Sequence, residues 1–346
     1  MTLRISVGQS PIVTPEYLAF AKQVGARGIQ LNTPELPGNE RWEAEDILSI
    51  VNKVRRAGLV VEAFENIPNH FYDKAMVGAE GRDLQIENVK HTIRAVGEAN
   101  IPILGLNWLP QSVWRTALSN EGRGNAGVST YDHAIASDET RRSDVWVARR
   151  DLRVSDSKDS WRQGSIIRLP IGETTEQKMW ENYEYFVRAV IPTAEESGVV
   201  LAFHPDDPPV DSLDGVAHIL RNVDALVKAA TIVDSPNLAS ELCLGTVSEM
   251  GGEPAVLDAI DRLGQMGKIA YVHLRDVKGT VPKFEECFLG EGNYSPIRVI
   301  RALRDVNFDG FILDDHTPSM VDDDAYGYRG RAHALGYIQA LLAATL

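Results

Sequence analysis

Short apolar runs alternate with amphipathic stretches along most of the chain. Eight runs are rich in β-branched and aliphatic residues and have the length of buried strands. We expect strands at residues 3–8, 28–32, 60–65, 102–108, 199–204, 238–243, 269–274 and 310–315. Between them, apolar residues recur at helical spacing, as in residues 44–58 and 175–198. The pattern therefore predicts a series of βα units and a parallel sheet.

Eight βα units are the full count of a closed β/α barrel. A doubly wound open sheet is the alternative, but the first predicted strand is not followed by the G-x-G-x-x-G turn of that fold. The chain has no internal repeat beyond the βα unit and no low-complexity linker. We therefore predict an α/β protein whose residues 1–346 form a single (β/α)8 TIM-barrel domain.

One segment interrupts this rhythm after the fourth predicted strand. Residues 109–173 are polar, rich in Arg, Ser and Asp, and show little periodicity. A connection of this length usually covers an active site or makes an oligomer contact. We expect a long irregular insertion with one of these two roles, and a homo-oligomer.

Four residues that commonly bind metals lie at the ends of predicted strands: His204, Cys243, His273 and Asp315. They are separated by 39, 30 and 42 residues, which is about one strand, one loop and one helix per step. A barrel brings the carboxyl ends of its strands to one rim, so these side chains should converge. Imidazole, thiolate and carboxylate together suit a divalent first-row ion. The spacing therefore predicts a metalloenzyme.

Residue type alone does not carry this interpretation. A lone buried Cys is usually core packing, and His218 and His333 lie in helical patterns as ordinary residues. Asp206 and Asp207 are consistent with solvated loop charges. The shared position at strand ends favours a metal. Zn²⁺ would bind such a set well, and Mn²⁺, Fe²⁺ or Co²⁺ more weakly. Ligand types leave open whether the site is structural or keeps a position for catalysis.

Further polar residues accompany the predicted ligands. His316 and Tyr326 are candidate proton donors or acceptors. The candidate substrate-binding residues are Arg275, Arg115, His70 and Asn107. An Arg near a metal can hold a carboxylate through two parallel hydrogen bonds.

Charge and composition narrow the function classes. The net charge of −14 argues against nucleic acid as a partner, and an anionic substrate would need local positive charge from a metal, Arg or Lys. No apolar run approaches 18 residues, so we expect no membrane span. The first residues lack the basic and apolar regions of a secretory signal, and two cysteines form no disulfide framework. We expect a cytoplasmic protein.

Several motifs are similar to those of the mannonate dehydratase family. They are FHPDDPP (203–209), LCLGTVSEMGG (242–252), YVHLRDV (271–277), DDHTPSM (314–320), GYRGRAHALGYIQAL (327–341), ENIPNHFYDK (65–74) and LNWLPQSVWRT (106–116). The similarity spans roughly residues 1–116 and 175–346, and HPDDPP at a strand end is its most specific motif. The resemblance implies a metal-dependent TIM barrel with a xylose-isomerase-like architecture.

The resemblance also implies roles for the candidate residues. His204, Cys243, His273 and Asp315 match the family's metal ligands, and the usual ion would be Mn²⁺. His316 and Tyr326 match the positions assigned to acid and base, without telling which is which. The implied reaction removes water from D-mannonate to give 2-keto-3-deoxy-gluconate. It needs a base at the C2 proton and an acid at the leaving 3-hydroxyl.

Two positions depart from the family's pattern. Leu313 and Pro318 flank the fourth predicted ligand where the family has an Arg and a second His. A related sugar acid is therefore an alternative substrate. The second hypothesis is a metal-dependent sugar isomerase, epimerase or lyase of the same barrel class. The third is a non-catalytic barrel with a structural metal.

Overall fold

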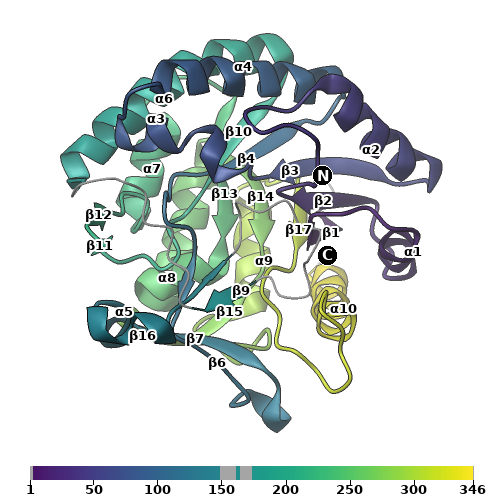
Figure 1. The fold of residues 1–346 in the computed structure, drawn as a ribbon. Helices are drawn as coiled ribbons and strands as arrows, with labels where there is room; N and C mark the ends of the chain where they lie inside the picture. The colour runs from purple at the N-terminus through teal and green to yellow at the C-terminus, as the bar shows by residue number, and fades with distance from the viewer. Residues whose placement is uncertain (1–2, 149–160, 164–173, 346) are drawn as a thin grey trace.

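A closed barrel of eight parallel strands forms the centre of the protein (Figure 1). The computed structural model describes residues 3–148, 161–163 and 174–345. The order around the barrel is β1-β17-β14-β13-β10-β4-β3-β2. The strands are β1 (Arg4–Ser10), β2 (Gly28–Asn32), β3 (Val60–Glu65), β4 (Ile103–Asn107), β10 (Val200–His204), β13 (Leu238–Cys243), β14 (Ile269–His273) and β17 (Phe311–Leu313). The predicted TIM barrel is confirmed.

The last barrel strand is shorter than the sequence predicted. We expected a strand over residues 310–315, but β17 ends at Leu313. Asp314 and Asp315 therefore follow the strand end, where the alternation of side chains between two faces no longer holds. Both aspartates are buried, and they bind different partners.

Helices surround the barrel and cover its outer face (Figure 1). They are α1 (Pro15–Gln23), α2 (Ala44–Arg56), α3 (Asp73–Val77), α4 (Arg82–Glu98), α6 (Glu176–Ser197), α7 (Val223–Thr231), α8 (Leu244–Gln265), α9 (Pro296–Asp305) and α10 (Tyr328–Ala344). Helix α6 shows why they form: its apolar residues recur on one side, and Tyr183, Phe186 and Val190 are fully buried. The Thr175 side chain accepts a hydrogen bond from the Lys178 N–H at its start, and Gly198 ends it with φ 66°.

The insertion contains more regular structure than its sequence indicated. Its described part holds β5 (Trp114–Arg115), β6 (Ala117–Ser119), β7 (Val128–Asp132), α5 (His133–Ala136), β8 (Trp146–Ala148) and β9 (Trp161–Gln163). The rest of residues 109–173, namely 149–160 and 164–173, lies outside the described residues. Strands β5, β8 and β9 form one small antiparallel sheet.

A hairpin that the sequence did not predict pairs with the insertion. Strands β15 (Asp276–Thr280) and β16 (Lys283–Cys287) follow β14 directly. They pair with the insertion in a four-stranded sheet of order β15-β16-β7-β6, which lies at the lower side of the molecule in Figure 1. The insertion is therefore tied to the loop that follows the seventh barrel strand. In the described ranges, no helix is long and apolar enough to cross a membrane.

Candidate metal centre

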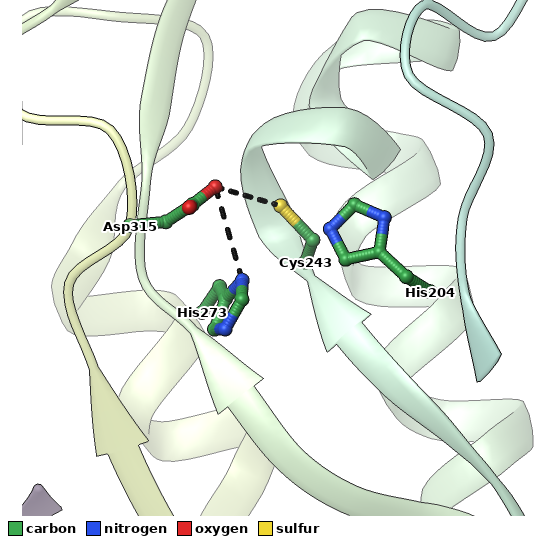
Figure 2. A group of neighbouring side chains, drawn as sticks. All are labelled: His204, Cys243, His273 and Asp315. Carbon is green, nitrogen blue, oxygen red and sulfur yellow. Dashed lines mark hydrogen bonds and ion pairs between the residues drawn. The ribbon is translucent and has the colours of Figure 1, made fainter. Parts of the chain in front are cut away.

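Four buried side chains converge at the carboxyl rim of the barrel. His204, Cys243 and His273 are the last residues of β10, β13 and β14, and Asp315 lies two residues beyond β17. One ligand atom from each lies within 4.8 Å of those of the others. Figure 2 shows the four side chains pointing toward one another. The structure thus brings together the residues that the strand-end spacing singled out.

The two imidazoles each turn one nitrogen away from the centre of the cluster. His204 Nδ1 is 2.5 Å from the carbonyl oxygen of Pro205, which leaves Nε2 available. His273 Nε2 lies 3.1 Å from Glu65 Oε2 and 3.3 Å from Glu241 Oε1, while its Nδ1 lies 3.8 Å from Asp315 Oδ2. His204 thus has the oxygen partner on its outer nitrogen that is usual for a metal-binding His, and the outer nitrogen of His273 faces two carboxylates.

The cluster fits a divalent cation chemically. His273 Nδ1 is buried and has no hydrogen-bond partner among the described residues, although it faces an anionic oxygen. Burial would raise the pKa of the Cys243 thiol, but the charge of Arg275 and the adjacent imidazoles of His204 and His273 lower it to about 5. A thiolate is the form of Cys that binds a metal. The cluster could therefore hold a metal ion through one thiolate, one carboxylate and two imidazoles.

Two buried arginines lie beside the cluster and are bound by protein carboxylates. Arg275 Nη1 donates to Asp207 Oδ2 at 2.9 Å and to Asp315 Oδ2 at 3.3 Å, and Nη2 pairs with Glu249. Arg115 donates to both oxygens of Asp207, at 2.6 and 2.9 Å. Burial would raise the pKa of Asp207, but Arg115 and Arg275 hold it below its usual range. Both guanidiniums are thus engaged within the protein, and substrate binding by them stays a prediction.

Sequence reasoning placed Asp206 and Asp207 wrongly among candidate solvated loop charges. Both are 1% exposed, and Asp206 Oδ2 accepts a hydrogen bond from the Leu220 N–H. His218 was also misplaced, since it is buried outside any helix, beside β12 (Val216–Ala217). Only three-dimensional proximity supplies the partners of these groups, so the sequence did not disclose what they bind.

His316 lies at the edge of the cluster and binds a carboxylate that was not predicted. Its Nδ1 is 2.6 Å from Oε1 of Glu286, on β16, and its Nε2 is 3.7 Å from Asp315 Oδ1. Arg115 donates to the same Glu286 oxygen at 3.0 Å. One weak sequence signal could have indicated Glu286. It lies two residues after Phe284, so the two side chains point to the same face of β16, and both are buried.

Tyr326 packs in an aromatic group beside the first barrel strand. Its hydroxyl donates to the Gly8 carbonyl at 2.7 Å, and its ring meets Tyr17 and Tyr328 with centroids 5.4 and 4.8 Å apart. The guanidinium of Arg331 lies 4.6 Å from the ring centroid. A catalytic role for Tyr326 stays a prediction, and its hydroxyl would have to leave the Gly8 carbonyl to act as an acid.

The other two predicted substrate-binding residues lie after neighbouring strands. Asn107 ends β4 opposite His204, and its buried side-chain Nδ2 has no hydrogen-bond partner among the described residues. His70 is exposed, in the short 3-10 helix Asn69–Phe71, and its ring contacts that of Phe71. Their roles also stay predictions.

The closed eight-stranded barrel and the cluster at its carboxyl rim define a TIM-barrel protein that could hold a metal ion. The crystal structure of a xylose isomerase domain protein from Planctomyces limnophilus has a TM-score of 0.60 at 13% identity. The match covers 100% of this chain and 98% of that chain, and it shows that the two proteins share a fold. The model of the D-mannonate dehydratase (UxuA) family matches residues 7–345. The chain belongs to this family of hydro-lyases.

Individual relatives agree with this assignment over almost the whole chain. The mannonate dehydratase of Thermotoga neapolitana is 30% identical over 336 residues, which cover 92% of this chain and 90% of the relative. The crystal structure of mannonate dehydratase from Streptococcus suis serotype 2 has a TM-score of 0.82 at 26% identity, with 100% of this chain and 95% of that chain covered. The two matches thus extend over nearly the full length of this chain and of both relatives.

Proposed function

We propose that this protein is a metal-dependent dehydratase that converts D-mannonate, or a closely related sugar acid, into a 2-keto-3-deoxy acid. The observation that carries the proposal is the buried cluster of His204, Cys243, His273 and Asp315 in a chain that matches the mannonate dehydratase family over residues 7–345. Four converging ligands at a barrel's carboxyl rim lie where such folds carry out chemistry.

The four clustered side chains would hold the ion, which we propose to be Mn²⁺ rather than Zn²⁺, Fe²⁺ or Co²⁺ on the resemblance to the family. When bound, the ion supplies positive charge for the sugar acid's carboxylate and for the negative charge that develops as C2 loses its proton. This charge matters in a protein of net charge −14 whose nearby arginines are already paired.

The chain's own groups would move the protons and exclude water. His316 borders the cluster and is one-quarter exposed, so its ring is placed to exchange a proton with a bound substrate. Gly127 of the insertion and Ser319 exchange two backbone hydrogen bonds, 3.0 and 2.8 Å long, just beyond His316. We propose that the insertion covers the rim and keeps solvent from the reaction.

The proposal is tested by incubating the purified protein with D-mannonate and Mn²⁺ and measuring 2-keto-3-deoxy acid with thiobarbiturate. We expect product that disappears after EDTA treatment and returns with added Mn²⁺. Full activity in the metal-free protein would refute the proposal. Because Leu313 and Pro318 differ from the family's pattern, other hexonates and pentonates belong in the same assay.

Two further proposals concern the oligomeric state and the location of the protein. We propose a homo-oligomer, for which the insertion supplies surface beyond the barrel, and light scattering in solution tests it. We also propose a cytoplasmic location. This proposal rests on the sequence, in which two cysteines among 346 residues are too few for the disulfide framework of a secreted domain.

A further inference from the structure

The His316 ring contacts a carboxylate from outside the barrel. Nδ1 of His316 and Oε1 of Glu286 are 2.6 Å apart. Two electronegative atoms at this distance must share a proton. Arg115 donates to the same oxygen at 3.0 Å, so this oxygen acts as an acceptor. The proton between the two residues therefore belongs to His316 Nδ1.

A competing contact is weaker. Arg275 Nη1 lies 3.4 Å from the same His316 nitrogen and would require a bare Nδ1 to accept its hydrogen. Arg275 already has shorter bonds to Asp207, at 2.9 Å, and to Glu249. The shorter contact with Glu286 decides which nitrogen of His316 carries the hydrogen.

We propose that Glu286 is a positioning residue that holds His316 with its hydrogen on Nδ1, so that Nε2 is the base that takes the C2 proton. The role of Nε2 as the base rests on the proposed dehydration, whereas the contact between Glu286 and His316 does not. In that step the C2–H bond breaks, an N–H bond forms at Nε2, and the C2–H electron pair forms the C2=C3 bond of an enol. The C3–O bond breaks with its electrons on oxygen, and the departing hydroxyl takes up a proton that balances the one held at Nε2. Water leaves, and the enol becomes the 2-keto acid.

The position of Glu286 depends on the hairpin that the insertion supports. Strand β16 pairs with β7 through Phe284 opposite Tyr131 and Glu285 opposite Thr130. Tyr131 and Phe284 stack with ring centroids 5.4 Å apart, and both are buried. This packing fixes the strand that presents Glu286 to His316. The added sheet thus serves the proton-transfer group as well as covering the rim.

The Glu286→Gln substitution tests the proposal through its effect on catalysis. A general base contributes about 100- to 10,000-fold, and a base that is no longer held in place loses part of this, so we expect kcat to fall by about 10- to 100-fold. KM should change less than about threefold, since substrate binding is not the target. The control is Glu285→Gln, on the opposite face of the same strand and half-buried, which should leave kcat unchanged.

A double-mutant cycle separates positioning from general damage. If Glu286 acts through His316, Glu286→Gln should add nothing to the loss caused by His316→Asn. If the double variant lost kcat by the product of the two single losses, the proposal would be wrong. A Glu286→Gln variant with wild-type kcat would also overturn it. The Glu286→Gln and His316→Asn variants are each loaded with Co²⁺, and the thiolate-to-metal absorption band is measured. A variant whose metal site has collapsed would lose this band.

Nitrogen NMR of the Zn²⁺-loaded protein gives a readout that needs no turnover. The His316 signals are identified by their loss in His316→Asn. They should show hydrogen on Nδ1 in the wild type, and in Glu286→Gln the hydrogen should be shared between Nδ1 and Nε2. Hydrogen on Nε2 in the wild type would overturn the assignment. If the wild type dehydrates no sugar acid, the proposed function fails, yet this spectrum still decides whether Glu286 orients His316.

Discussion

The metal cluster and the ion-pair network beside it are built in different ways. The cluster takes three of its four residues from the last positions of adjacent barrel strands, where Cys243 lies opposite His273 in register. The network takes Arg115 from the insertion, Asp207 from a loop, Glu249 from α8 and Glu286 from a hairpin. The barrel geometry sets the first region, and the packing of loops sets the second.

The largest expected effect comes from breaking the cluster itself. Cys243→Ala removes the thiolate ligand, so we expect metal affinity to fall by more than the about 100-fold that loss of an outer contact can cost. Dehydration should become undetectable at the metal concentration that saturates the wild type. Metal content by mass spectrometry and the thiobarbiturate assay measure the two losses.

Cys287→Ala is the matched control for this prediction, because Cys287 is the other buried cysteine and lies outside the cluster. It should keep its metal. Wild-type metal content in Cys243→Ala would exclude Cys243 as a ligand and leave a site of two imidazoles and one carboxylate.

This contrast explains what the sequence could predict. A strand that ends in a ligand repeats with each βα unit, so His204, Cys243 and His273 were placed at one rim from their spacing alone. Glu286 was missed because the strand carrying it follows β14 without a helix, which breaks the βα rhythm. Asp207 was misjudged because a charge in a loop sequence does not disclose its buried partners.

A smaller effect is expected from breaking the ion-pair network. Arg275→Met leaves Asp207 and Glu249 buried with one fewer cation, and removal of one partner from a buried pair costs about 3–5 kcal/mol. We expect the free energy of unfolding, measured with urea, to fall by this amount. Activity should fall as well, because Arg275 also binds Asp315.

The comparison for Arg275 is an exposed ion pair on a helix. Lys178 and Glu181 lie on α6 with half of each side chain exposed, and Lys178→Ala should cost less than about 1 kcal/mol. Equal losses from the two substitutions would mean that the buried network contributes no more to stability than a surface pair does.

The smallest expected effect is at Tyr326, which lies outside both regions. Tyr326→Phe removes the hydrogen bond to the Gly8 carbonyl and should cost about 1 kcal/mol of unfolding free energy. The ring keeps its contacts with Tyr17 and Tyr328, so packing should be preserved. Urea unfolding measures the stability, and the dehydration assay measures kcat on the same preparation.

The kcat of Tyr326→Phe then decides whether this residue belongs with the catalytic groups. An acid at the leaving hydroxyl contributes about 100-fold or more, far beyond what a loss of 1 kcal/mol in a protein that stays folded would cause. A loss of that size would show that the hydroxyl leaves the Gly8 carbonyl during turnover. An unchanged kcat would make Tyr326 a support for the first barrel strand. His316, held by Glu286, would then be the proton-transfer group that the described residues place at the cluster.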